Sequence, residues 1–208
     1  MTYSVSLIPA PGFASDCWLL FDPVSGEAAV IDPSAPCEEI GQALRENCLT
    51  LRWILFTHGH FDHLFALDAL RDASGAPAVI HEADASLLAD PIANVSAIFL
   101  HENHIYRPAE RTVREGDELL LGAGAIRVLH TPGHTPGSVC YAAGDILFTG
   151  DTLFDCGMGR TDLPGGDSFV MRRSLERLSL LADGIRICPG HGAPSDMGTQ
   201  KQNNPYLN

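Results

Sequence analysis

The chain has 208 residues, of which 45% are hydrophobic and 19% are charged, so it can form a sizeable apolar core and is not expected to be disordered. Its 26 acidic residues outnumber its 13 basic residues, which gives a formal net charge of -13. Nucleic acids and anionic membrane surfaces are bound through basic patches, so we expect neither as a partner. No apolar run approaches the roughly 20 residues that span a bilayer.

The N-terminus and the cysteines indicate a cytoplasmic protein. Residues 1–6 contain neither the basic nor the continuous apolar region of a secretory signal peptide, so we expect none. The six cysteines are scattered without a C-x-x-C pair, and we expect most of them to be small buried hydrophobic residues rather than disulfide partners. No linker-like stretch divides the sequence, and we predict a single domain over residues 1–208.

The first third of the chain is predicted to alternate strands and helices. Strands are predicted at residues 3–8, 17–21 and 28–31, with a turn at 22–26. A helix follows, with Pro36 at its first position and an apolar stripe that reaches Cys48. A second unit runs from a strand at 53–56 into a helix with leucines at 64, 67 and 70. Residues 90–107 mix Pro, Asn, Ser and His and are interpreted as a long loop or lid beside a site.

The last third is predicted to be mainly strands, followed by one amphipathic helix. The predicted strands are 119–121, 126–129, 139–141, 146–148 and 185–188. The helix covers residues 167–182, with Asp167 as its N-cap and Met171, Leu175, Leu178 and Ala182 on one side. Two similar halves of this kind indicate an α+β fold of two packed sheets with helices on the outer faces, although one doubly wound sheet also fits the pattern.

Histidines and aspartates flanked by glycine come directly after four of the predicted strands. The four segments are His58-Gly59-His60-Phe61-Asp62-His63, Thr131-Pro132-Gly133-His134, Thr149-Gly150-Asp151 and Pro189-Gly190-His191-Gly192. If these strands lie side by side, their carboxyl ends bring five histidines and two aspartates to one edge. Such side chains bind zinc, iron or manganese, and seven of them suffice for two ions if one carboxylate bridges.

The first segment is the most specific of the four. Four metal-capable groups within six residues, His58 to His63, have little purely structural use, whereas an isolated Pro-Gly-His or Gly-Asp turn is common. The remaining histidines, His81, His101, His104 and His130, lie in no such arrangement. We expect these four to be structural or surface residues.

With these motifs in this order, the sequence resembles the metallo-β-lactamase-fold hydrolase superfamily, and within it the compact glyoxalase II-like (hydroxyacylglutathione hydrolase-like) proteins. The resemblance implies an αββα sandwich of two mixed sheets with two divalent metal ions at one edge, zinc being expected and iron or manganese being alternatives. It implies that His58, His60 and His134 bind the first ion and that Asp62, His63 and His191 bind the second. Asp151 would bridge the two ions.

The activity that the resemblance implies is hydrolysis of a small acyl thioester such as S-lactoylglutathione by a metal-bridging hydroxide, with Asp62 and Asp151 as the catalytic carboxylates. In the loop after the bridging aspartate, this family usually has a lysine and, two residues on, a tyrosine. Here those positions are Arg160 and Asp162. Arg160 is a candidate to bind a substrate carboxylate, and a salt bridge with Asp162 is an equally good interpretation.

Three alternatives stay open. A persulfide dioxygenase would share residues 159–162 and use a single Fe(II) held by His58, His134 and Asp151. A lactone hydrolase would use the same metal centre on an ester. A non-catalytic metal-binding module is the weakest alternative, because a full ligand set has little purpose without a reactive water. The sequence therefore predicts a metal-dependent hydrolase more firmly than it predicts the substrate.

Overall fold

Two six-stranded mixed sheets face each other in the computed structural model, which describes residues 3–12 and 14–207. Residues 1, 2, 13 and 208, and with them both ends of the predicted domain, lie outside the described residues. The strands of the first sheet, in spatial order, are β1 (Ser4–Ile8), β2 (Cys17–Phe21), β3 (Glu27–Ile31), β4 (Thr50–Leu55), β5 (Ala78–His81) and β6 (Arg111–Val113). Those of the second are β12 (Ser195–Asp196), β11 (Arg186–Pro189), β10 (Ile146–Gly150), β9 (Val139–Ala143), β8 (Gly124–His130) and β7 (Glu118–Leu121).

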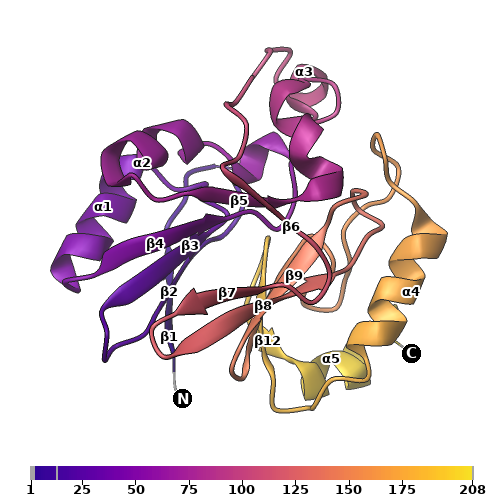
Figure 1. Cartoon of the computed structure of the whole chain (residues 1–208). Coiled ribbons are helices and arrows are strands. Elements are labelled where there is room, and N and C mark those ends of the chain that lie inside the picture. Colours follow the sequence, from indigo (N-terminus) through magenta and orange to yellow (C-terminus); the bar gives the residue numbers. More distant parts are fainter. Residues whose placement is uncertain (1–2, 13, 208) are drawn as a thin grey trace.

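Helices cover the outer faces of both sheets (Figure 1). The helical elements are α1 (Cys37–Glu46), α2 (Leu67–Ser74), α3 (Ser96–Phe99), α4 (Ser168–Leu178), α5 (Met197–Asn203) and the 3-10 turns η1 (Phe61–His63) and η2 (Glu82–Ala89). Helices α1 and α2 lie against the first sheet, and α4 and α5 lie against the second. The αββα sandwich predicted from the sequence is thereby confirmed, and the doubly wound single sheet is excluded.

Strand β2 shows why the sandwich is stable. Its side chains alternate between two apolar layers: Cys17 and Leu19 pack beneath the helices, whereas Trp18 and Leu20 pack between the sheets. All four are at most 2% exposed. A strand buried on both faces reads as a continuous apolar run, as this one does. Replacing Leu19 by alanine should lower the free energy of unfolding by about 2–5 kcal/mol.

Several predicted boundaries are wrong. The first helix ends at Glu46, and Cys48 is exposed with a φ of 53°, so it does not continue the apolar stripe. Pro36 is the N-cap rather than the first helical residue. Helix α4 ends at Leu178, which leaves Ala182 exposed, although Asp167 caps it as predicted by accepting hydrogen bonds from two backbone amides. The interpreted loop 90–107 contains the short helix α3.

The cysteine prediction is only partly confirmed. All six are free thiols, as expected. Three of them, Cys17, Cys140 and Cys188, are buried, whereas Cys48 and Cys156 are exposed and Cys37 is half-buried. The prediction that most are buried is therefore wrong, because Cys48 and Cys156 lie in turns with positive φ rather than in strands.

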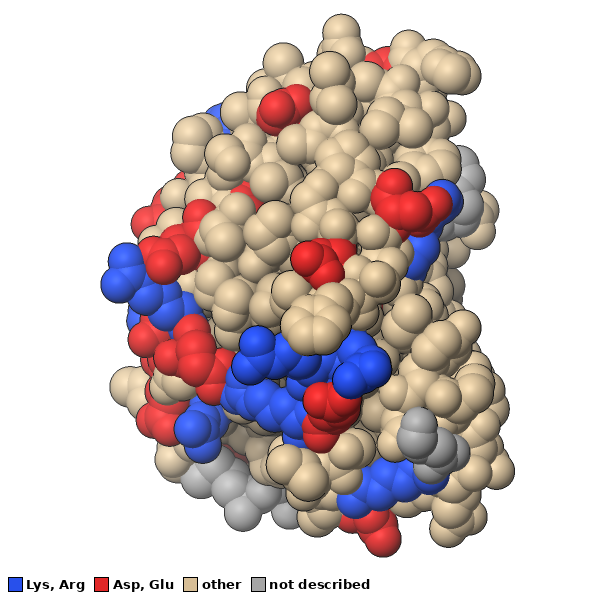
Figure 2. All heavy atoms as spheres, turned by 90° about the vertical axis from the view of Figure 1, so that its right-hand side faces the viewer, with Lys and Arg blue, Asp and Glu red and all other residues tan. Residues whose placement is uncertain are grey.

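The charges on the face formed by α4 are grouped (Figure 2). Basic side chains gather in the lower half of that view with acidic side chains among them, and the upper part, which includes the α3 segment, carries few charges. On α4, Arg172 pairs with Glu176 and Arg177 pairs with Glu115. Within residues 3–12 and 14–207, no helix has the length and apolarity needed to cross a bilayer.

Candidate metal centre

The four loops singled out in the sequence meet at one edge of the sandwich. They follow β4, β8, β10 and β11, so both sheets contribute. Close approach requires glycine at two of these turns. Gly150 has a φ of +46°, and a Cβ there would lie 2.3 Å from the Thr57 hydroxyl. A Cβ on Gly190 would lie 2.4 Å from a carboxylate oxygen of Asp151 and 2.8 Å from Cε1 of His63, which comes from the loop after β4. These glycines therefore allow the loops of the two sheets to touch.

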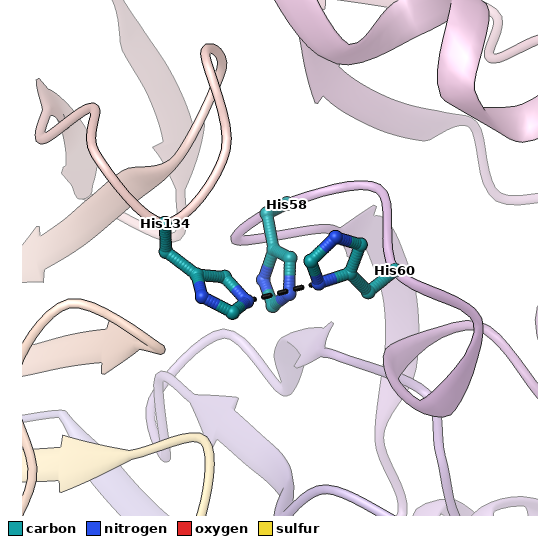
Figure 3. Close-up of side chains that lie close together, drawn as sticks. All are labelled: His58, His60 and His134. Atoms are coloured by element: carbon teal, nitrogen blue, oxygen red, sulfur yellow. Dashed lines mark hydrogen bonds between the residues drawn. The ribbon is translucent and has the colours of Figure 1, made fainter. Parts of the chain in front are cut away.

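Three histidines form the histidine cluster, defined as His58, His60 and His134 (Figure 3). His58 and His60 come from the loop after β4, and His134 reaches them from the second sheet. Their ring centroids are 4.6–4.7 Å apart, and Nε2 of His134 is 2.9 Å from Nδ1 of His60. Each residue is at most 2% exposed. Three imidazoles packed this closely can share one metal ion.

A second group, the mixed cluster, consists of Asp62, His63 and His191. Nε2 of His191 lies 3.3 Å from Oδ2 of Asp62, and Nε2 of His63 lies 3.9 Å from the same oxygen. The His63 side chain is fully buried, whereas that of His191 is 36% exposed. This cluster is therefore open to solvent on the His191 side.

Asp151 lies between the two clusters. Its Oδ2 is 3.4 Å from Nε2 of His134, and its Oδ1 is 3.3 Å from Nε2 of His63. Oδ1 is also 3.8 Å from Nε2 of His191. The two oxygens of one carboxylate thus face different clusters, which suits a ligand that contacts two ions.

The residues present fit a pair of divalent ions. Nε2 of His58, Nε2 of His60 and Oδ1 of Asp151 are buried and have no hydrogen-bond partner among the described residues. Buried polar atoms without hydrogen-bond partners raise the free energy of the folded state. Their concentration in one place therefore indicates a site for a ligand. Nitrogen and carboxylate donors suit zinc, iron and manganese, and metal ligation would satisfy these atoms.

The protonation states support the same conclusion. Burial lowers the pKa of His58 well below its ordinary value and, together with His134, lowers the pKa of His60 to about 3. Both rings are therefore neutral and keep a lone pair for a metal. Burial raises the pKa of Asp151, but His63 and His134 lower it further than burial raises it, so this carboxyl is ionised.

Two buried aspartates that the sequence did not single out hold the ligands in place. Oδ2 of Asp32 lies 2.9 Å from Nδ1 of His63, and Asp32 also accepts hydrogen bonds from the backbone amide and hydroxyl of Thr57. A carboxylate on the second nitrogen of a metal-binding histidine fixes the ring orientation. Asp32 follows β3 directly, so the strand-end rule that found Asp151 could also have found it.

Asp84, in η2, is the second of these residues. It accepts hydrogen bonds from the backbone amides of Gly59 and Gly137, at 3.0 and 2.6 Å, and from the hydroxyl of Thr135. It therefore joins the loop of His58 and His60 to the loop of His134. No local motif around Asp84 signals this role, because its partners are 25 to 53 residues away in the sequence.

Arg160 lies at the wall of the pocket beside the metal-capable residues. Its guanidinium donates two hydrogen bonds of 2.7 Å to Asp162, and its Cζ is 5.9 Å from the ring centroid of Phe99. Its backbone carbonyl accepts a 2.7 Å hydrogen bond from Nδ1 of His134, which leaves Nε2 of that ring to face the cluster. The predicted salt bridge of Arg160 with Asp162 is therefore present, and binding of a substrate carboxylate by Arg160, which borders the pocket, stays a prediction.

The other histidines lie outside both clusters. His81 and His130 stack with centroids 4.1 Å apart, and His130 contacts the carbonyl of Pro136 through Nε2. His101 is exposed, and His104 is half-buried and pairs with Glu102. These positions agree with the structural and surface roles expected for them.

Two clusters with Asp151 between them, set at the edge of an αββα sandwich, indicate a metallo-hydrolase with the metallo-β-lactamase fold. The chain belongs to the metallo-β-lactamase superfamily, whose family model matches residues 10–191. It is 34% identical over 209 residues to the hydroxyacylglutathione hydrolase GloC of Haemophilus influenzae, covering 99% of this chain and 98% of that protein. It is 36% identical over 185 residues to the probable metallo-hydrolase YqgX of Bacillus subtilis, covering 88% of each.

Solved structures agree with this assignment. The BLEG-1 B3 metallo-β-lactamase superposes with a TM-score of 0.91 at 33% identity, over 98% of this chain and 99% of that one. TTHA1623 in a di-iron-bound form gives 0.84 at 32% identity, over 97% and 100%. ETHE1 from Myxococcus xanthus gives 0.77 at 30% identity, over 97% and 83%. The predicted family and fold are therefore confirmed.

Proposed function

We propose that the protein is a dinuclear metal-dependent hydrolase that cleaves a small acyl thioester. The observation that carries this proposal is the position of Asp151, whose two oxygens face the histidine cluster and the mixed cluster. The similarity to a hydroxyacylglutathione hydrolase supports a thioester as the substrate. S-lactoylglutathione is accordingly the first substrate to test.

Each part of the centre has a role in this proposal. His58, His60 and His134 would hold one ion, Asp62, His63 and His191 would hold the other, and Asp151 would contact both. When bound, two divalent ions supply a water of lowered pKa and positive charge for the oxygen of the carbonyl under attack. Asp32 keeps the His63 ring oriented, and Arg160 does the same for His134 through its backbone carbonyl.

Cleavage of a thioester requires little acid–base catalysis from the remaining residues. A thiolate is a stable leaving group, so its departure requires no dedicated general acid. Asp62 and Asp151, the catalytic carboxylates of this proposal, border the pocket in which the carbonyl would lie. We expect zinc at the site, with iron or manganese as alternatives, because the nitrogen and oxygen donors suit all three. We also propose that the protein acts in the cytoplasm on a small molecule, without a nucleic-acid or membrane partner.

The test is thiol release from S-D-lactoylglutathione and from acyl thioesters of a neutral thiol, with metal content measured on the same sample. Turnover with about two ions per chain supports the proposal. Two ions without thioester turnover contradict it and direct the assay to lactones and β-lactams. One iron per chain with oxygen consumption on a glutathione persulfide would favour the dioxygenase instead. The presence of the whole mixed cluster favours the dinuclear outcome.

A further inference from the structure

The pocket at the metal centre is lined by both polar and apolar side chains. Its volume is about 570 Å³, and its polar lining consists of His60, Asp62, His134, Asp151, His191 and Arg160. Its apolar lining, called the apolar wall, consists of Phe61, Val95, Phe99, Leu100, Phe154 and Leu163. Phe61 and Val95 are at most 3% exposed, and the Phe61 and Phe99 rings are 6.5 Å apart, so this wall is packed. A substrate carbonyl at the ligands would place the neighbouring part of the molecule against this wall.

The wall offers no free cation. Among the described residues that line the pocket, Arg160 is the one Lys or Arg, and Asp162 holds its guanidinium through two hydrogen bonds. The ring of Phe99 lies over the same group. A substrate carboxylate would have to compete with Asp162 for the bidentate face of the guanidinium.

The surface around this region is also poor in charge. In the view of Figure 2, few charged side chains appear in the upper part, which includes the α3 segment. In α3, Ile98 is 42% exposed and Phe99 is 49% exposed. The approach to the pocket therefore includes exposed apolar surface, which suits an apolar acyl chain.

From these observations we propose that the site selects thioesters whose acyl group is uncharged and apolar, such as butyryl or hexanoyl, over those whose acyl group bears a carboxylate. This inference rests on the proposed thioester hydrolysis. In that reaction water adds its oxygen to the acyl carbon, the C–S bond breaks, and the sulfur leaves with the electron pair and takes up a proton. The apolar wall holds the acyl chain while the carbonyl lies at the ligands.

The experiment compares acyl groups on one neutral thiol, N-acetylcysteamine, with the metal-loaded protein. Each methylene fully buried against the wall is worth about fourfold, and the pocket is partly open, so kcat/KM should rise about tenfold from acetyl to hexanoyl. Butyryl and succinyl thioesters have the same number of acyl carbons and differ by a carboxylate. We expect butyryl to be the better substrate by about tenfold.

Two variants test the wall itself. Phe99→Ala should lower kcat/KM for the hexanoyl thioester about fivefold and leave that for the acetyl thioester within about twofold. Phe169→Ala, at an exposed phenylalanine of α4 outside the pocket lining, is the matched control and should change neither value.

The outcomes separate the two proposals. A kcat/KM that is flat or falls with chain length, or a succinyl thioester that matches butyryl, overturns the apolar selectivity while thioester hydrolysis stands. A loss of acetyl and hexanoyl turnover to the same extent in Phe99→Ala also overturns it. No turnover of any thioester by protein carrying two ions contradicts the proposed function itself, and the selectivity falls with it.

Discussion

The histidine cluster and the mixed cluster differ in burial and in charge. The first has three histidines, each at most 2% exposed, and burial lowers the pKa of His58 and of His60. The second includes Asp62 and the 36% exposed side chain of His191. Burial alone would lower the pKa of His63, but the neighbouring carboxylates raise it well above its ordinary value. The histidines of the histidine cluster that are neutral can therefore bind a metal without losing a proton, whereas the mixed cluster must first release protons.

The most severe test of this comparison is to remove Asp151, the carboxylate that lies between the two clusters. Asp151→Ala should lower kcat by at least about 1,000-fold, or ~4 kcal/mol in activation free energy, because each ion loses a ligand. The checks are steady-state kinetics, metal content and thermal unfolding. Substantial residual hydrolysis by folded Asp151→Ala would remove the bridging role.

Removing one histidine from each cluster separates their contributions. His58→Ala should eliminate the ion of the histidine cluster and lower kcat/KM by about 1,000-fold, since the ligand is fully desolvated. His191→Ala should keep that ion and lower kcat/KM by about 10- to 100-fold, because its open cluster can accept a water instead. Metal analysis of the two purified variants gives the stoichiometry. Equal losses of metal and of kcat/KM in the two variants would show that the clusters do not bind their ions independently.

Asp32→Asn tests whether Asp32 holds the His63 ring of the mixed cluster in its orientation. The neutral amide should weaken the orientation of the His63 ring and lower metal affinity or activity by about 10- to 100-fold. Asp183→Asn, an exposed carboxylate paired with Lys201, is the control and should leave both unchanged. Competition with a chelator measures the affinity. A change in thermal stability without a change in affinity would restrict Asp32 to a role in folding.

The smallest expected effect is a pH dependence of metal loading. Because the pKa of His60 is lowered to about 3 and that of His63 is raised, a fall in pH protonates the mixed cluster first. In metal-free protein titrated with zinc, the ion of the mixed cluster should bind more weakly at pH 6 than at pH 8, and that of the histidine cluster should change less. The measurement is calorimetric titration at both values. If two ions bind equally well at pH 6, the difference in pKa assigned to the histidines of the two clusters is wrong.

The candidate ligands could be predicted from the sequence because each follows a strand within a few residues, and such signals are local. Asp84 could not, since its role depends on the contact between two loops from different sheets. The ends of helices were also missed. The apolar period continues past Leu178 to Ala182, but the helix ends at Leu178 and Ala182 is exposed, although Leu181 still packs against the core of the second sheet. The local pattern thus predicts which elements form better than it predicts where they end.

The carboxylate of Asp84 has a consequence for how the protein matures. It joins loops that belong to different sheets, and the rings of His60 and His134, 74 positions apart in the chain, meet beside it. Contacts between such distant positions require the closure of a long loop, which costs conformational entropy. Until the two halves dock, the loop after β4 therefore holds His58, His60, Asp62 and His63 without the ligands from the second sheet. The complete chelating pocket, and with it tight metal capture, belongs to the finished molecule alone.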